Sequence, residues 1–232
     1  MSFVLIHGAG FGADCWDALV PRLRAESLAV DLPGRGTRAA SALGTTTLAD
    51  CAEAVREDIE ARDLRDVVLV GHSFAGVTVP RVIDLVPERI RHVVLVSAVV
   101  PADGTRVLDQ IDPGVRDLVE SSITGGVYRQ SREGAAAMLC NDMDEATAAS
   151  TLARLVDDSA ALLTESVDLS GYRRSIPLTY VHLTRDQCYV EELQQRSIAL
   201  LGPEKVVDLD TGHMAMVSAP GELAAILNAV HG

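Results

Sequence analysis

The most informative stretch of the sequence is Asp66–Val86, DVVLVGHSFAGVTVPRVIDLV. It begins with a short apolar run, Asp66–Val70, of the kind that forms strands buried in parallel sheets. The segment that follows, Phe74–Val86, has the apolar spacing of a helix. Ser73 is therefore predicted to lie on a sharp turn from strand to helix, where its hydroxyl would be exposed as a nucleophile.

Small residues on both sides of this serine fit such a turn. The turn forces the serine into a strained backbone conformation, so the residues two positions away must be small. Gly71 meets this requirement, and Ala75 departs from the usual glycine but is still small. The alternative is an ordinary tight turn in which Ser73 has no chemical role.

The same alternation of short apolar runs and longer helical segments extends along most of the chain. The sequence predicts strands at Phe3–Ile6, Leu28–Asp31, Asp66–Val70, His92–Val96, Leu178–Leu183 and Val206–Leu209. It predicts helices at Asp14–Glu26, Leu48–Arg62, Phe74–Val86, Val190–Leu201 and Gly221–Val230. This alternation is typical of an α/β fold, here with a mostly parallel sheet of about six strands flanked by helices.

One segment, residues 102–175, breaks this alternation. It is rich in alanine, has helical character and contains no run typical of a buried strand, with Gly125-Gly126 as a breaker. We therefore expect a core made of residues 1–101 and 176–232, and a helical cap insertion at 102–175.

Two further side chains can complete the chemistry of an activated serine. Such a serine needs a general base, and the base needs a carboxylate that fixes its tautomer. Asp186 follows the predicted strand Leu178–Leu183, and His213 follows the predicted strand Val206–Leu209. Because the carboxyl ends of parallel strands meet at one edge of the sheet, we expect both side chains to approach Ser73 there.

Two other carboxylates are alternatives for the acid. Asp103 follows the predicted strand His92–Val96 and is the stronger alternative. Asp210 stands three residues before His213, which is too close along the loop for it to orient the imidazole ring. We therefore expect Asp186 to be the acid.

A second glycine-rich motif, Gly8-Ala9-Gly10-Phe11-Gly12-Ala13, follows the first predicted strand. It fits the G-x-G-x-x-G/A pattern of dinucleotide-binding folds, and Asp31 ends the next strand 23 positions after Gly8. Nucleotide binding would not explain Ser73, or the carboxylate and histidine that follow later strands. We therefore favour a backbone that turns tightly beside Ser73 and directs N–H groups at an oxyanion, without a cofactor.

Composition and charge exclude several other classes. The 232-residue chain is 48% hydrophobic and has a formal net charge of −13, with 20 basic and 33 acidic residues. It has no basic run to displace counterions from nucleic acid or to bind an anionic membrane surface. Lys205, the only lysine, is not followed by Ser or Thr, which excludes a Walker A loop.

The cysteines and histidines do not indicate a metal site. The four cysteines form no C-x-x-C pair, and no two histidines have the spacing of metal ligands. His182 is expected in the core, and His92 and His231 are not expected at the site. No export signal precedes the first strand and no apolar run approaches the ~20 residues of a membrane span, so we expect a cytoplasmic protein. A monomer and a homodimer are both left open.

Several segments resemble the α/β-hydrolase superfamily, namely Val4–Gly10, Asp31–Gly36, Gly71–Gly76 and Gly212–Met216. Within it, the chain is most similar to the plant methylesterase and hydroxynitrile lyase group and its small bacterial relatives, through Leu183–Asp186 and Val96–Pro101. The resemblance covers both ends of the chain and leaves the insertion unmatched.

The resemblance implies a role for each candidate residue. Ser73 would be the nucleophile, His213 the general base and Asp186 the acid that orients the base. The backbone N–H groups of Ala9 and Phe74 would form the oxyanion hole.

The resemblance also gives expectations for the substrate pocket. We expect contacts from residues beside the catalytic groups and from the cap, namely Gly8, Phe11, His72, Met214, Tyr128, Met138 and Leu139. Core packing is the alternative for Phe11 and Met214, and a structural role is the alternative for His72. His7 is expected to brace the oxyanion loop.

Two departures distinguish the chain from the lyase members. Those members carry a threonine at the position of Gly8 and a lysine at the position of Met214, directly after the catalytic histidine. Both departures favour a serine hydrolase that cleaves a small-molecule carboxylic ester through an acyl-enzyme intermediate. The alternatives are a hydroxynitrile lyase-like or C–C bond-cleaving enzyme on the same scaffold, and a small-molecule binding protein.

Overall fold

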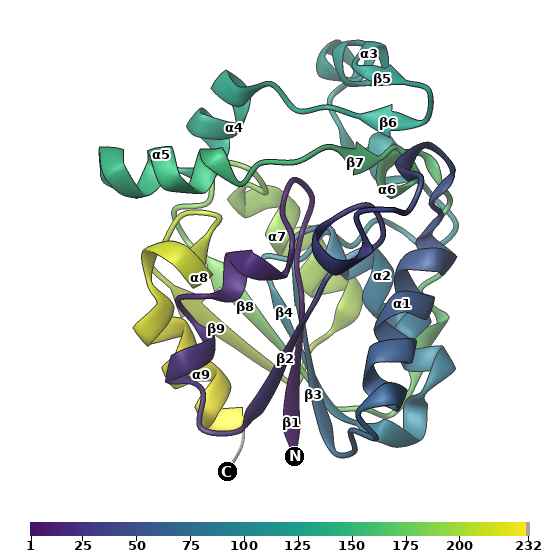
Figure 1. The fold of residues 1–232 in the computed structure, drawn as a ribbon, viewed down its shortest axis with the longest axis vertical. Coiled ribbons are helices and arrows are strands. Elements are labelled where there is room, and N and C mark those ends of the chain that lie inside the picture. Colours follow the sequence, from purple (N-terminus) through teal and green to yellow (C-terminus); the bar gives the residue numbers. More distant parts are fainter. Residues whose placement is uncertain (231–232) are drawn as a thin grey trace.

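Six strands form one parallel sheet in the order β2-β1-β3-β4-β8-β9, which confirms the predicted sheet (Figure 1). The computed structural model describes residues 1–230, so His231 lies outside the described residues. The strands are β1 (Ser2–Ile6), β2 (Glu26–Val30), β3 (Val67–His72), β4 (Ile90–Val96), β8 (Leu178–Leu183) and β9 (Lys205–Leu209). Every neighbouring pair is parallel, so the six carboxyl ends lie at one edge.

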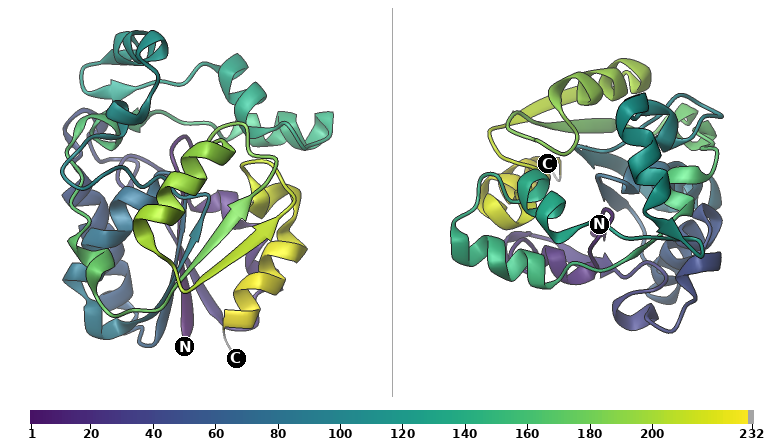
Figure 2. Two further views of the ribbon diagram at one scale, coloured as in Figure 1. Left: turned by 180° about the vertical axis from the view of Figure 1, so that it is seen from behind. Right: turned by 90° about the horizontal axis from the view of Figure 1, so that it is seen from above.

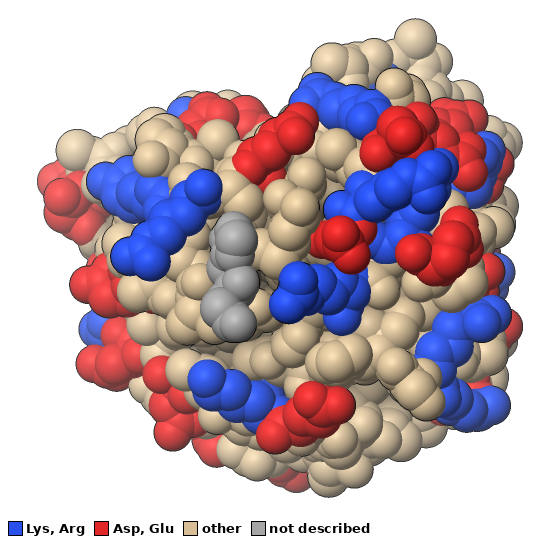
Figure 3. Space-filling view, turned by 90° about the horizontal axis from the view of Figure 1, so that it is seen from below, with Lys and Arg blue, Asp and Glu red and all other residues tan. Residues whose placement is uncertain are grey.

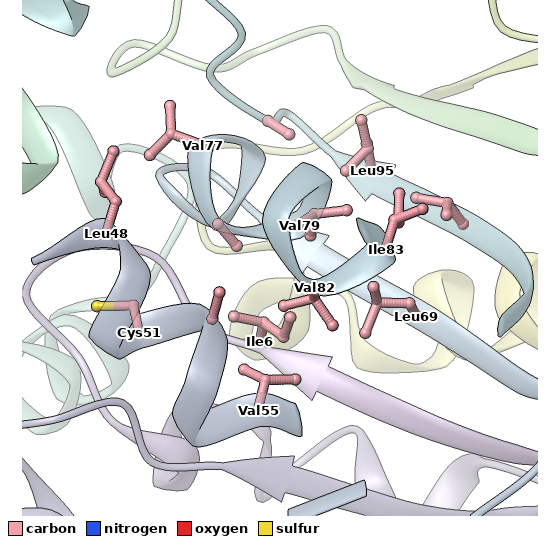
Figure 4. Packing of buried hydrophobic residues seen from close by; sticks show 14 of the residues in the cluster. Ile6, Leu48, Cys51, Val55, Leu69, Val77, Val79, Val82, Ile83 and Leu95 are labelled. Atoms are coloured by element: carbon pink, nitrogen blue, oxygen red, sulfur yellow. The ribbon is translucent and has the colours of Figure 1, made fainter. Parts of the chain in front are cut away.

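Helices cover both faces of this sheet. They are α1 (Leu48–Ala61), α2 (Ala75–Leu85), α7 (Glu191–Leu201), α8 (Ala215–Ser218) and α9 (Pro220–Val230). Successive side chains of a strand point to opposite faces. In β1, Val4 and Ile6 therefore join the cluster under α1 and α2, whereas Phe3 and Leu5 join the cluster under α9. Figure 4 shows the first cluster, with Ile6 and Leu69 beneath the two helices.

The predicted helix at Asp14–Glu26 is wrong. The segment forms two short 3-10 helices instead, η1 (Ala13–Trp16) and η2 (Val20–Arg22). Pro21 explains the difference, because proline has no N–H to donate and its ring clashes with a carbonyl of the preceding turn. The apolar residues that suggested a helix still cover the sheet, and Trp16 is fully buried.

The insertion lies across the carboxyl ends of the strands, at one end of the molecule (Figures 1 and 2). It contains α3 (Pro113–Ser121), α4 (Arg132–Leu139), α5 (Glu145–Ala153), α6 (Ala161–Thr164), η6 (Val107–Gln110) and η7 (Ser170–Arg173). It is not wholly helical as predicted, since β5 (Ile123–Thr124), β6 (Val127–Tyr128) and β7 (Asp158–Ser159) form a small antiparallel sheet. Gly125 and Gly126, expected as a breaker, form a hairpin turn that needs their positive φ angles of 58° and 75°.

Close backbone contact joins this hairpin to a loop of the core. A Cβ on Gly126 would lie 2.2 Å from the carbonyl oxygen of Gly44, and a Cβ on Gly44 would lie 2.3 Å from the carbonyl oxygen of Gly125. Beside this contact, the Ser159 hydroxyl donates to the carbonyl of Thr46 at 2.5 Å. The insertion and this loop therefore pack as one unit.

Figure 3 shows the end of the molecule opposite the insertion, where basic and acidic side chains alternate. Among the described residues, the basic side chains form no continuous field on this face. Among residues 1–230, no helix combines the length and the apolar character that crossing a bilayer requires.

Candidate active site

Ser73 lies on the predicted turn between β3 and α2. Its φ of 54° is in the left-handed region, which is strained for a residue other than glycine. The turn is held by the Ser73 N–H, which donates to Val96 O at 3.1 Å, and by the Ser73 carbonyl, which accepts from Val99 N–H at 2.9 Å. A Cβ on Gly71 would lie 2.8 Å from a methyl group of Val79, so the small residue at this position has a steric cause.

The structure brings Ser73, His213 and Asp186 together. Ser73 Oγ lies 3.0 Å from His213 Nε2, and His213 Nδ1 lies 2.6 Å from Asp186 Oδ2. The three residues follow β3, β9 and β8, and only 4%, 2% and 4% of their surfaces are exposed. With Nδ1–H donated to Asp186, Nε2 is placed to accept the proton of Ser73.

Four donors hold the Asp186 carboxylate. Besides His213, Oδ2 accepts the Ser97 hydroxyl at 2.6 Å, and Oδ1 accepts the backbone N–H groups of Cys188 at 2.7 Å and Tyr189 at 2.9 Å. Burial raises the pKa of Asp186, but attraction to His213 and these hydrogen bonds outweigh burial and lower the pKa below its ordinary value. Asp186 is therefore an ionised partner for His213.

Ser97 is a residue of this site that the sequence did not single out, although it lies within the segment Val96–Pro101. It directly follows β4, and its φ of 41° is again unusual for a residue other than glycine. Its N–H donates to the carbonyl of Val181 at 2.9 Å, which fixes the turn that directs the hydroxyl at Asp186. The available signal was its position after a strand adjacent to β3, at the same edge of the sheet.

The two alternative acids lie in other contacts. Asp103 accepts the backbone N–H of Leu169 at 2.9 Å and pairs with Arg173 at the surface. Asp210 pairs with Arg185 at 3.2 Å, also at the surface. Neither carboxylate bonds to His213 in the described part of the chain.

Two buried histidines support the loops on either side of the site. Burial is the main cause that lowers the pKa of His7 and of His72 to about 3, so both are neutral. His7 Nδ1 donates to Gly8 O at 2.8 Å while its Nε2 accepts Leu32 N–H at 3.2 Å, so His7 braces the glycine loop as predicted. His72 Nε2 donates to the backbone carbonyl of His213 at 2.9 Å, and the two rings lie 4.6 Å apart.

The environment of His213 sets its protonation. Burial lowers the pKa of His213, but the Cys188 sulfur and the Asp186 carboxylate raise it, and the net effect places it above its ordinary value of 6.5. The imidazolium that forms when His213 accepts a proton is stabilised by the Asp186 carboxylate, which is already bonded to Nδ1.

Ala9 and Phe74 are the residues whose backbone N–H groups are expected to form the oxyanion hole. Both residues line the same cavity as Ser73 and His213. Among the described residues, neither N–H donates to another protein group. Gly10, with a φ of 78°, allows the loop to turn beside Ser73. Their role as oxyanion donors stays a prediction.

A cavity of about 360 Å³ extends from Ser73 and His213 to the insertion. The predicted cap residues Tyr128, Met138 and Leu139 line it. The sequence did not identify the other residues that line it, namely Val99, Val107, Gln110, Ile111, Asp112, Val115, Val119, Gln130, Leu163, Cys188, Tyr189 and Leu193. They come from segments far apart along the chain, which only the fold brings together.

The expectation that Gly8, Phe11, His72 and Met214 line this cavity is wrong. A Cβ on Gly8 would lie 2.7 Å from Ser73 Cβ, so this residue packs directly under the serine. Phe11 and Met214 line a separate hollow beside α5. His72 is buried beneath His213. A residue next to a catalytic group in sequence need not face the cavity, because the backbone turns sharply in the glycine loop, at Ser73 and at His213.

The described residues offer no obvious place for a metal ion. Among residues 1–230, no group of three or more His, Cys, Asp or Glu side chains is arranged as metal ligands. The polar groups around Ser73 are bonded to one another instead.

Comparison with known proteins adds family information to this geometry. Residues 3–226 match the profile of the alpha/beta hydrolase family. The chain is 35% identical to "Putative methylesterase 12, chloroplastic" of Arabidopsis thaliana over 46% of this chain and 32% of that protein. It is 33% identical to a carbendazim hydrolyzing esterase of a Nocardioides species, over 55% of this chain and 54% of that protein.

A solved structure covers the chain more completely. An extracellular alpha/beta-hydrolase from a Paenibacillus species superposes with a TM-score of 0.88 and 27% identity, over 98% of this chain and 97% of that one. It is described as sharing structural and functional homology with Tobacco Salicylic Acid Binding Protein 2. By contrast, the chain spans only 28% to 62% of the length of three Arabidopsis relatives that it matches.

Proposed function

Since the chain belongs to the alpha/beta hydrolase family, we propose that it cleaves a carboxylic ester through an acyl-enzyme intermediate. The observation that carries this proposal is the bonded series of Ser73, His213 and Asp186 at the base of a cavity. The esterase names of relatives from a plant and a bacterium support the same reaction class.

The geometry supports a two-step reaction. Ser73 Oγ attacks the ester carbonyl carbon while His213 Nε2 takes the hydroxyl proton. The carbonyl oxygen becomes an oxyanion that faces the N–H groups of Ala9 and Phe74. His213 then protonates the departing alcohol oxygen, which leaves Ser73 acylated. The same imidazole then deprotonates a water molecule, which attacks the acyl carbon. The bond from the acyl carbon to Ser73 Oγ breaks as His213 returns the proton to Oγ, which releases the acid and restores the free serine.

The cavity favours an uncharged and mostly apolar ester. In the described part of the chain, its lining includes no lysine or arginine, and Asp112 is its one carboxylate. Gln110 and Gln130 are its amide side chains, and the remaining wall is largely aliphatic and aromatic. A volume of about 360 Å³ suits a small organic molecule.

The lyase alternative is less well supported than ester hydrolysis. In lyase members that the sequence resembles, a threonine at the position of Gly8 holds the substrate hydroxyl, and a lysine at the position of Met214 supplies a cation beside the histidine. Here a Cβ on Gly8 would lie 2.7 Å from Ser73 Cβ, and Met214 is a buried, uncharged side chain outside the cavity. A protein that only binds its ligand would need no bonded Ser–His–Asp series.

We expect the wild-type chain to hydrolyse short p-nitrophenyl esters and to release cyanide from mandelonitrile no faster than the uncatalysed background. The carbonyl oxygen of an ester would face two backbone donors, whereas no lysine or arginine among the described residues lines the cavity to stabilise departing cyanide. Release of p-nitrophenol and of cyanide are measured on the same preparation, with Ser73→Ala as the control. Fast cyanide release that depends on Ser73, without ester turnover, would contradict the ester assignment.

We expect kcat/KM for a neutral ester to fall as the pH is lowered through the pKa of His213. The general base must be neutral, and its pKa lies above 6.5, so the midpoint of the acid limb should also lie above pH 6.5. His7 and His72, with pKa values of about 3, should add no limb in this range. Initial rates across pH give the midpoint, and an acid limb centred well below pH 6.5 would contradict the assignment of the base.

Three broader expectations stay predictions. The absence of nucleic-acid binding rests on the net charge of −13, and the cytoplasmic location rests on the sequence alone. The choice between a monomer and a homodimer requires a measurement of mass in solution, for which light scattering is suited.

A further inference from the structure

The insertion holds the glycine loop that carries Ala9. The Gly10 carbonyl accepts from the backbone N–H of Val156 at 2.9 Å, and the Gly10 N–H donates to Oδ2 of Asp158. Both partners lie in the segment that runs from α5 to β7. The peptide bonds before and after Gly10 are therefore fixed by residues that are distant in sequence and belong to the wall above the site.

Asp158 is a buried carboxylate with a separate donor on each oxygen. Only 3% of its surface is exposed, Oδ2 accepts the Gly10 N–H, and Oδ1 accepts Nη2 of Arg35 at 2.6 Å. The Arg35 side chain is also buried, and its Nη1 donates to the carbonyl of Phe11 in the same loop at 3.2 Å. Burial raises the pKa of Asp158, against the attraction of Arg35 and the bond from Gly10.

Asp157, the neighbouring carboxylate, has a different environment from Asp158, although the sequence gives no reason to distinguish the two. The Asp157 side chain forms an exposed ion pair with Arg129 and does not bond to Gly10. Burying an ion pair is costly, and an apolar pair of similar volume is often at least as stable. The buried Arg35–Asp158 pair is therefore weak evidence for stabilisation, whereas its bonds to Gly10 and Phe11 act directly on the glycine loop.

Asp158 also connects this loop to the cavity wall. It pairs with Tyr128 across the β6–β7 ladder, and Tyr128 lines the cavity. Asp158 thus lies between Tyr128, which lines the cavity, and the peptide bond that follows Ala9, an expected oxyanion donor.

We propose that Asp158 is a positioning residue, which directs the Ala9 N–H at the oxyanion by holding the Ala9–Gly10 peptide bond. The proposal rests on the ester hydrolysis proposed above, because the oxyanion forms only during acyl transfer. Oxyanion donors act through preorganised direction toward the transition-state oxygen, and a small misplacement costs rate. Asp158 touches none of the reacting atoms, so its loss should lower kcat and leave KM nearly unchanged.

A matched pair of double variants separates the acceptor for Gly10 from the ion pair. Arg35→Met/Asp158→Asn and Arg35→Met/Asp158→Leu both lack the buried charges and have side chains of similar size at 158. Only the asparagine has an oxygen that can accept the Gly10 N–H. We expect kcat for a p-nitrophenyl ester to be about tenfold or more lower in the leucine variant than in the asparagine variant, at similar KM.

An inhibitor that forms an oxyanion gives a second readout. A trifluoromethyl ketone adds to the serine and places a negative oxygen in the oxyanion hole. The inhibition constant of the ketone should be larger in the leucine variant by the factor by which kcat is smaller. A purely structural role would not make the inhibition constant and kcat change together. Asp157→Asn is the control, and it should retain wild-type kcat and ketone affinity.

Two outcomes would overturn the positioning role in an active enzyme. One is equal kcat and ketone affinity in the asparagine and leucine variants, and the other is a difference confined to KM. Circular dichroism checks folding, and Arg35→Met/Asp158→Ala replaces the leucine variant if that variant is unfolded. A wild-type chain that neither turns over esters nor reacts with a fluorophosphonate would instead overturn the proposed function, and the positioning role with it.

Discussion

Ser73→Ala is expected to lower kcat for a p-nitrophenyl ester by about six orders of magnitude, the scale on which a bonded triad loses activity without its serine. Without Oγ, no acyl-enzyme can form, and His213, which Asp186 orients, has no serine proton to accept. The variant should fold, because alanine keeps the Cβ and the backbone bonds of the turn. Initial rates on the purified variant give the loss, and a reduction smaller than about a hundredfold would contradict nucleophilic catalysis by Ser73.

Covalent labelling provides an independent check on the same residue. A fluorophosphonate should add once to the wild-type chain and not at all to Ser73→Ala, as measured by intact mass. Ser150, exposed on α5, offers a matched control, since Ser150→Ala should label like the wild type. Labelling that persists in Ser73→Ala would place the nucleophile elsewhere.

Asp186→Asn is expected to lower kcat by about 10⁴-fold, because the imidazole would adopt the wrong tautomer. The backbone N–H groups of Cys188 and Tyr189 would hold the amide oxygen on the Oδ1 side. The amide nitrogen would then face Nδ1 of His213, which accepts from it and leaves the proton on Nε2. A protonated Nε2 cannot take the proton of Ser73.

The control for this substitution is Asp103→Asn. Asp103 is bonded to Leu169 and Arg173 at the surface, so the variant should keep kcat close to that of the wild type. Rates of both variants with one ester distinguish the two acids. A large loss in Asp103→Asn together with a mild one in Asp186→Asn would assign the acid to the loop after β4.

The strands and the three bonded side chains could be predicted because their signals are local. Buried parallel strands are apolar along their whole length, and the turn at Ser73 requires small neighbours for a steric reason. Asp186 and His213 follow strands whose carboxyl ends must share one edge. The apolar spacing of Asp14–Glu26 does not produce an α-helix, because Pro21 interrupts the helical hydrogen bonds.

The cavity and the loop contacts could not be predicted in the same way. Phe11 and Met214 stand next to residues of the site in sequence, yet the backbone turns them into a different hollow. Asp157 and Asp158 are identical in type and adjacent, and only the three-dimensional fold exposes one and buries the other. Such differences depend on packing between distant segments, for which a single sequence carries no periodic signal.

Recombination between members of this family would have to move the insertion together with part of the core. The backbones of Gly126 in the insertion and Gly44 in the core are in direct contact. A Cβ on Gly126 would lie 2.2 Å from the carbonyl oxygen of Gly44, and a Cβ on Gly44 would lie 2.3 Å from that of Gly125. A graft of residues 102–175 onto a host with a larger residue at position 44 would therefore be forced away from the site. Crossover points that keep residues 44–46 with their own insertion are expected to give folded chimeras, so an exchange of the insertion requires two separate segments of the chain.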